Sequence, residues 1–142
     1  MELHYAMLAD AAQVSEGKTY ILGGGVSILW RSEFPAPLAF TIVCQFTYER
    51  TEAETDHEIR FVIMDADGNR LLPDIQGGFH LGPPGPHIPS NVPLVVPLVI
   101  GLPPMPVLQR PGAYQVQILL DNRHMDTLPF AVARPPEESS HG

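Results

Sequence analysis

The sequence predicts an all-β protein, a single antiparallel sandwich of about seven to nine short strands. Hydrophobic residues make up 44% of the 142-residue chain, enough for a packed core, and 16 prolines and 12 glycines indicate frequent turns. Several segments alternate apolar and polar residues with the period of two that a half-buried strand requires. Cys44 is the only cysteine, so no internal disulfide can form.

The first thirty residues are expected to form short strands separated by turns. In order, we expect a strand at Leu3–Leu8, a turn at Ser15–Lys18, a strand at Thr19–Leu22, a bent connection at Gly23–Gly25 and a strand at Val26–Trp30. Residues 6–14 are also rich in helix formers, so a short helical turn is an alternative there. The three glycines favour a β-bulge.

The clearest strand is Leu38–Tyr48. Its apolar face is expected to consist of Leu38, Phe40, Ile42, Cys44, Phe46 and Tyr48. Cys44 is best interpreted as a small core residue, because a reactive thiolate needs exposure and nearby positive charge.

A further strand followed by an Asp-Gly turn is expected next. Glu58–Met64 has a strand pattern, Asp65–Asn69 contains the hairpin signal, and Gln76–Leu81 is a candidate for a short strand. The acidic turn also resembles the start of a calcium loop. However, Gln76 stands at the twelfth position, where an EF-hand needs glutamate, so we interpret the segment as a plain turn.

Prolines restrict the segment that follows. Gly82–Pro89 holds four prolines in eight residues and is expected to run extended along the surface. Val92–Gly101 is strongly apolar, but Pro93 and Pro97 each remove a backbone donor. A strand in this segment must therefore lie at a sheet edge or contain a bulge.

Pro111–Val132 predicts a hairpin whose strands belong to the core. Asp121-Asn122 lies between two alternating runs, and both residues tolerate the left-handed backbone of a tight turn. Ahead of the hairpin, Gly112-Ala113-Tyr114 resembles the tyrosine corner of immunoglobulin-like domains; an ordinary core tyrosine is the alternative. The predicted sandwich is therefore immunoglobulin-like.

We expect one domain over residues 1–134 and a flexible polar tail over residues 135–142. The N-terminus lacks a signal-peptide pattern, and no apolar run is long enough to cross a bilayer. Together with the single cysteine, this predicts a cytoplasmic protein without membrane partners. The formal net charge of −8, with a single lysine, leaves no basic stripe for phosphates, so nucleic acid is expected not to be a partner.

No motif predicts a catalytic residue, a metal or a cofactor. Gly23, Gly24 and Gly25 could present backbone amides as a loop site, but no helix or lysine-serine pair follows them. The six histidines lack zinc-ligand spacing. His80 and His87 flank the glycine-proline loop and are the pair to examine, although surface histidines beside a loop are commoner than ligands.

The opening of the chain resembles a family of short uncharacterised bacterial proteins of unknown function. The matching pattern is Ala9-Asp10-Ala11-Ala12-Gln13-Val14, then Gly17-Lys18, then Tyr20-Ile21-Leu22-Gly23-Gly24-Gly25. The segments Pro111–Tyr114 and Phe130–Val132 fit as well. The resemblance implies a compact immunoglobulin-like sandwich and carries no known activity or site residue.

Three functions are compatible with these observations. The first is a non-enzymatic binding or assembly module with a protein partner or a second copy, whose interface is formed by Val92, Leu94, Val96, Leu98, Met105 and Val107. The second is a small-ligand or carbohydrate receptor that uses Trp30 and Tyr48 as stacking platforms. The third, which we rank last, is a metal-dependent hydrolase with His80, His87 and Asp74.

Overall fold

The computed structural model describes residues 1–136, which form an all-β fold with one turn of 3₁₀ helix, η1 (Arg50–Glu52). The strands are β1 (Glu2–Ser15), β2 (Lys18–Gly24), β3 (Ile28–Trp30), β4 (Ala36–Leu38), β5 (Thr41–Tyr48), β6 (Asp56–Asp65), β7 (Ile75–His80), β8 (Leu94–Gly101), β9 (Met105–Leu108), β10 (Gly112–Leu120) and β11 (Arg123–Ala133). Eleven strands exceed the seven to nine expected. Most of the predicted tail, residues 137–142, lies outside the described part of the chain.

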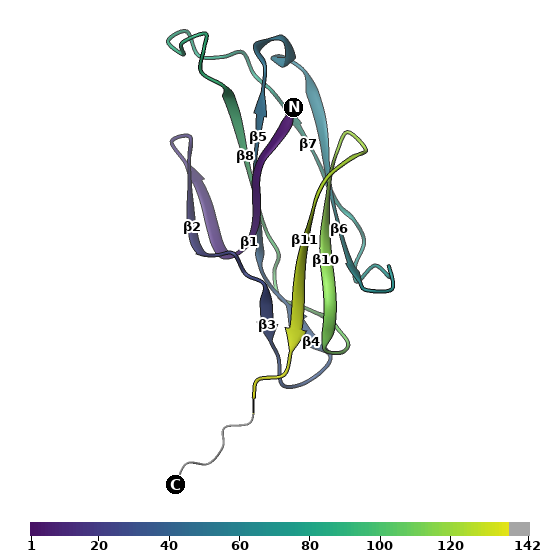
Figure 1. The fold of residues 1–142 in the computed structure, drawn as a ribbon. Helices are drawn as coiled ribbons and strands as arrows, with labels where there is room; N and C mark the ends of the chain where they lie inside the picture. Colours follow the sequence, from purple (N-terminus) through teal and green to yellow (C-terminus); the bar gives the residue numbers. More distant parts are fainter. Residues whose placement is uncertain (137–142) are drawn as a thin grey trace.

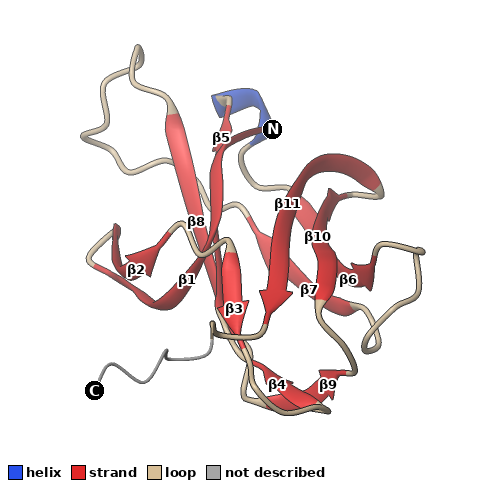
Figure 2. Ribbon diagram, turned by 60° about the horizontal axis from the view of Figure 1, so that its bottom comes forward, coloured by secondary structure: helices blue, strands red, loops and turns tan. Residues whose placement is uncertain are grey.

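Two main sheets contribute to one hydrophobic core (Figure 1). The first sheet has the order β2-β1-β5-β8 and the second the order β3-β11-β10-β6-β7. A small third sheet pairs β4 with β9 near one end of the molecule (Figure 2). The pairing of β3 with β11 is parallel, and the other strand pairs are antiparallel.

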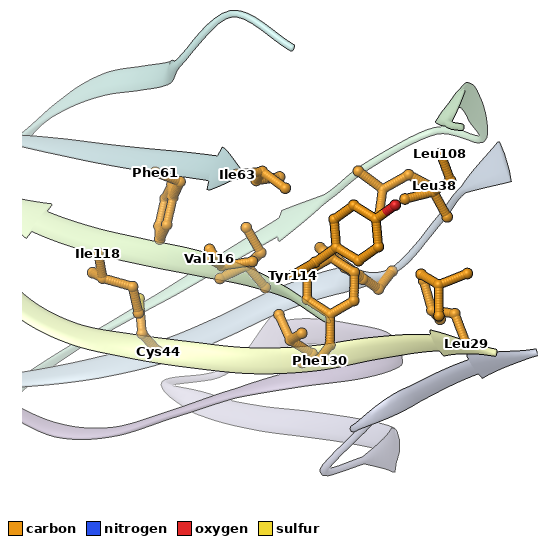
Figure 3. Close-up of a cluster of buried hydrophobic side chains, with 14 of the residues drawn as sticks. Leu29, Leu38, Cys44, Phe61, Ile63, Leu108, Tyr114, Val116, Ile118 and Phe130 are labelled. Carbon is orange, nitrogen blue, oxygen red and sulfur yellow. The ribbon is translucent and has the colours of Figure 1, made fainter. Parts of the chain in front are cut away.

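The core is filled by the apolar faces of the alternating strands. Figure 3 shows Cys44 of β5, Phe61 of β6, Val116 of β10 and Phe130 of β11 gathered in one cluster. The ring of Phe130 lies edge-on to that of Phe40, with centroids 5.2 Å apart. Burial raises the pKa of the Cys44 thiol to about 12, which agrees with its interpretation as a core residue.

Five of the six side chains predicted for the apolar face of Leu38–Tyr48 are buried and the sixth, Tyr48, is half-buried, but the segment is two strands. Ile42 and Phe46 are fully buried, as is Leu38. Leu38 pairs with Met105 of β9, whereas from Thr41 onward the chain pairs with β1 and β8. The chain changes partners between these positions, which alternation of side chains along one segment cannot reveal.

The hairpin predicted within Pro111–Val132 is confirmed as β10 and β11, in the middle of the second sheet. Asp121 and Asn122 have φ values of 51° and 65°, so both central turn residues are left-handed, as a type I′ turn requires. The Tyr114 hydroxyl donates a hydrogen bond to the carbonyl oxygen of Arg110, four residues upstream. The hydroxyl thus ties the start of β10 to the backbone of the loop before it.

The turn after β6 is also held by a side chain. The Asp65 carboxylate accepts hydrogen bonds from the backbone N–H groups of Asn69 and Asp67, and Gly68 has a φ of 84°. The hydrogen bond from Asn69 lowers the pKa of Asp65. The carboxylate thus serves the turn itself, in agreement with the plain turn expected here.

Strand β1 decides the shape of the first sheet. Its residues 2–15 are extended throughout, so the alternative of a helical turn at residues 6–14 is wrong. As far as Ala9, β1 pairs with β5; from Ala9 to Ser15, it pairs with β2 on its other side. At the opposite edge of this sheet lies β8, where Pro97 is tolerated, as expected from the proline pattern.

The tyrosine contact predicts a measurable loss of stability. Replacing Tyr114 by Phe removes the donor of a partly buried hydrogen bond to the Arg110 carbonyl and should lower the free energy of unfolding by about 0.5–1.5 kcal/mol. Urea unfolding measures this change. Tyr20→Phe removes a hydroxyl from a side chain that is 56% exposed, so it is the matched control and should change stability by less than about 0.5 kcal/mol. Equal stability of the two variants would contradict the role of the Tyr114 hydroxyl.

Candidate functional site

A two-stranded arm, residues 10–24, extends from the first sheet. It consists of the end of β1 and the whole of β2, and Figures 1 and 2 both show it standing at one margin of the molecule. None of its residues is buried. Beyond Ala9, β1 no longer pairs with β5, so each strand of the arm has only the other as its neighbour. An isolated two-stranded ribbon is marginally stable in water.

Both faces of the arm carry exposed apolar side chains. Cross-strand partners share a face, so Leu22 and Tyr20 lie with Ala11 on one side, and Ile21 lies on the other. Leu22 is 71% and Tyr20 56% exposed. Six of the nine exposed large hydrophobic side chains of residues 1–136 fall between residues 14 and 30, namely Val14, Tyr20, Ile21, Leu22, Ile28 and Trp30. The arm and β3 therefore hold most of the exposed large hydrophobic side chains of the described residues.

The sequence of the arm explains its shape. Glu16 and Gly17 have φ values of 52° and 74° and form a two-residue turn of type I′. At the other end, Gly23 has a φ of 63°, and a Cβ at this position would meet the Asp10 carboxylate. Glycine adopts this left-handed backbone without strain, and the bend leads the chain from β2 in the first sheet to β3 in the second. The loop site predicted at Gly23, Gly24 and Gly25 is exposed and has this structural use.

The side chains predicted as an interface lie mostly against the core. Leu94 is 4% exposed, while Val96, Leu98 and Val107 are half-buried and pack on the core cluster. Met105 is half-buried in β9, and only Val92, at 45%, is exposed. On β8, Leu94 and every second residue after it, such as Val96 and Leu98, point toward the core. Val95 lies on the opposite face of the strand and is 44% exposed. The predicted set therefore offers little exposed apolar surface to a partner.

The structure does not gather the predicted histidine site. His80 lies exposed on β7 with Nδ1 2.7 Å from Asp56 Oδ1, and His87 is exposed in the loop that precedes β8. Asp74 forms an ion pair with Arg70 instead, at 2.7 Å. Within residues 1–136, no three His, Cys, Asp or Glu side chains form a group able to hold a metal ion.

The two aromatic side chains proposed as stacking platforms line different hollows. Tyr48 borders a cavity of about 530 Å³ together with Arg50 and Asn91. The Arg50 guanidinium donates to the carbonyl oxygens of Ile88 and Pro89 and so holds the loop beside this cavity. Trp30 lines a separate shallow hollow of about 480 Å³ at β3.

Sequence reasoning missed a hydrogen-bonded network around His57. Its Nδ1 lies 2.6 Å from Asp121 Oδ2, and its Nε2 lies 2.7 Å from the Thr55 hydroxyl. These spacings are those of a nucleophilic triad, but the Thr55 hydroxyl donates to the carbonyl oxygen of Glu52, which can only accept. The hydroxyl proton thus points away from the imidazole, which therefore does not accept it as the base of a triad would. The network instead joins η1 to β6 and to the β10–β11 turn.

Asp121 is the anion of this network. Burial acts to raise its pKa, but hydrogen bonds from the backbone N–H of Glu58 and from His57 outweigh burial, so the pKa of Asp121 lies below its ordinary value. Since Asp121 is 64 residues from His57 in the sequence, no local motif could have indicated the pair.

The lowered pKa of Asp121 predicts a pH-dependent contribution to stability. Asp121→Asn keeps a residue that tolerates the left-handed turn but removes the charge, and should cost about 0.5–1 kcal/mol at pH 7, reduced by the 43% exposure of the side chain. A carboxyl with a lowered folded-state pKa stabilises above its unfolded pKa of about 4, and this contribution disappears as the pH falls through the folded-state value. The difference between wild type and variant in urea unfolding should therefore shrink below about pH 4.

The exposed Asp67→Asn provides the control, because Asp67 is 72% exposed and its contact with Arg110 is 3.3 Å long. This substitution should leave the free energy of unfolding nearly unchanged at both pH 3 and pH 7. A difference for Asp121→Asn that is the same at pH 3 and pH 7 would contradict the charged role of Asp121.

A solved structure that this chain resembles is that of the Pseudomonas fluorescens alkylpurine DNA glycosylase AlkC bound to DNA containing an abasic site analog. The superposition has a TM-score of 0.46 at 9% identity and covers 93% of this chain, which spans 30% of the glycosylase chain. That neighbour is bound to DNA, so we correct the sequence-based prediction and withdraw the exclusion of nucleic acid. At this TM-score, the likeness carries no argument about the ligands of this chain.

No curated protein matches the chain. Among the described residues, no helix has the length and apolar character needed to cross a membrane. The model of one protein family matches residues 4–133, nearly the whole described fold, including the arm and the His57 network. The chain therefore belongs to the family of unknown function DUF6941.

Proposed function

We propose that this protein is a non-enzymatic binding or assembly module whose contact element is the β1–β2 arm. The observation that carries the proposal is that residues 10–24 expose both faces while holding apolar side chains at Tyr20, Ile21 and Leu22. Covering these side chains would add the hydrophobic stabilisation that a bare two-stranded ribbon lacks.

Edge-strand docking fits the chemistry of the arm. The free edge of β2 offers backbone N–H and C=O groups to an added strand, and the neighbouring side chains offer apolar contacts. The segment Thr19–Leu22 has no proline and no charge, the features with which proteins usually protect exposed edges. The contact element thus differs from the apolar stretch of residues 92–107 favoured by the sequence.

We also propose an immunoglobulin-like relationship and a cytoplasmic location in a bacterial cell. The hydrogen bond from Tyr114 to Arg110 supports the former, because this contact is typical of immunoglobulin-like strand corners. The buried, unpaired Cys44 is compatible with the latter.

A small-ligand receptor is the second candidate, favoured by the cavity of about 530 Å³ beside Tyr48. A thermal-shift screen of sugars and nucleotides should then find a compound that raises Tm for wild type and fails to do so for Tyr48→Ala. No shift with any compound would argue against this candidate.

The assembly proposal predicts that the arm controls the native size of the protein. The double variant Tyr20→Ser, Leu22→Ser removes two exposed side chains and should change the free energy of unfolding by less than about 1 kcal/mol. In an extract of cells that produce the chain at its natural level, wild type should elute in size-exclusion chromatography well above the 15.6 kDa of one chain, and the double variant near it.

Val95→Ser is the matched control for this experiment. Val95 is 44% exposed on the other edge strand of the same sheet, so the control removes comparable apolar surface outside the arm. Its elution should equal that of wild type. If wild type itself elutes as a single chain, or if the double variant elutes with wild type, the arm is not the contact element.

A further inference from the structure

We propose that the free edge of β2 pairs with β2 of a second copy of this chain, antiparallel and centred on Tyr20. This inference rests on the proposed function and names a second copy of the chain as the partner that binds the arm. The pairing would join the two four-stranded sheets into one continuous sheet across a two-fold axis.

The turn of the arm determines which backbone groups face outward. In a two-residue hairpin, the residues flanking the turn, here Ser15 and Lys18, form a hydrogen-bonded pair. The N–H and C=O groups of successive residues point to opposite sides of a strand. Those of Tyr20, two residues after Lys18, therefore also point toward β1. Thr19 and Ile21 therefore present theirs at the free edge.

These two residues are complementary to themselves under two-fold symmetry. Antiparallel pairing centred on Tyr20 places Thr19 opposite Ile21 of the second copy, and Ile21 opposite its Thr19. Both are outward-facing residues, so each pair can exchange N–H···O bonds in both directions. Gly23, with its left-handed backbone, ends the regular strand just beyond this stretch, so Lys18–Leu22 is centred on Tyr20.

The same register covers the exposed side chains. Tyr20 meets Tyr20 of the second copy in a non-hydrogen-bonded pair, where side chains approach most closely. Leu22, the most exposed large hydrophobic residue described, lies opposite Lys18, whose methylene groups can cover it while the ammonium group reaches solvent.

The other free edges are less suited to pairing. Pro97 removes a donor from β8, β3 has only three residues, and β7 contains the adjacent glycines Gly77 and Gly78. The β1 side of the arm carries the acidic Asp10 and two alanines, which favour strands poorly.

Charge on β2 itself does not oppose pairing with a second copy. Each chain carries a formal charge of −8, so two copies repel each other over most of their surface. Strand β2 contains no acidic residue, and its only charge is the positive Lys18. Pairing at β2 therefore brings no carboxylates of the two strands together, and Lys18 meets Leu22 rather than the second lysine.

Disulfide trapping of Tyr20→Cys in the full chain tests the register. Opposed residues of a non-hydrogen-bonded pair have Cα atoms about 4.5 Å apart, within the range of a disulfide. The native Cys44 is buried and its pKa is raised to about 12, so it does not compete. Under mild oxidation, we expect Tyr20→Cys to form a covalent dimer at least about 10-fold faster than Leu22→Cys or Val95→Cys, because only residue 20 meets itself.

A second variant tests the backbone pairing without a new cysteine. Ile21→Pro removes an outward N–H but no bond to β1, and it should shift the purified protein from dimer to monomer in sedimentation equilibrium. Val95→Pro on β8 is the control and should leave the dimer intact. Circular dichroism establishes that each variant is folded.

The outcomes separate the inference from the function on which it rests. Equal trapping rates for all three cysteine variants, or a purified wild type that is monomeric at every concentration, would overturn the self-pairing. If the arm still controls the native size in cell extract, the assembly function stands and the added strand comes from another protein. If the arm affects neither measurement, both the inference and the proposed function fail.

Discussion

The fold depends on the length of β1. This strand first completes the ladder with β5 and then, past Ala9, continues alone until β2 returns beside it. Its first half places Leu8 in the core, where it joins side chains from both main sheets. Its second half has no sheet to join. The same strand therefore anchors the fold and produces the one segment of the first sheet that is exposed on both faces.

Two exposed regions of the molecule have different physical characters. The region with η1 and the β10–β11 turn is held by polar contacts, in which Asp121 accepts hydrogen bonds from Glu58 and His57. These partners satisfy one another within the chain. The arm is held only by its own ladder and leaves backbone groups and apolar side chains without partners among the described residues. Unsatisfied surface of this kind, rather than a cavity, is what distinguishes it as a candidate site.

Local patterns in the sequence predicted much of the fold. The Asp121-Asn122 turn, the buried apolar face from Leu38 to Phe46 and the edge position of the strand containing Pro97 each depend on neighbouring residues, and the structure has all three. The division of one expected strand into β4 and β5 depends on which distant strand pairs with Leu38. Alternation of apolar and polar residues shows which side chains share a face of a strand, but not which other strand it pairs with.

The candidate site was harder to predict for a related reason. Leu94 and its neighbours are as apolar as the arm, and only the fold shows that they face the core while Leu22 does not. The uncharged, proline-free run Thr19–Leu22, between a turn and three glycines, was a usable signal of an unprotected edge. The His57 network joins residues 64 positions apart and left no local trace.

Amide hydrogen exchange of the unmodified protein, followed residue by residue at several concentrations, tests the central claim most directly. If a second copy covers β2, the amides of Thr19 and Ile21 should exchange more slowly as the protein concentration rises, and the amides of the Asp65–Asn69 turn, which lies in the other main sheet, should not change. Fast exchange of Thr19 and Ile21 at every concentration would contradict the account.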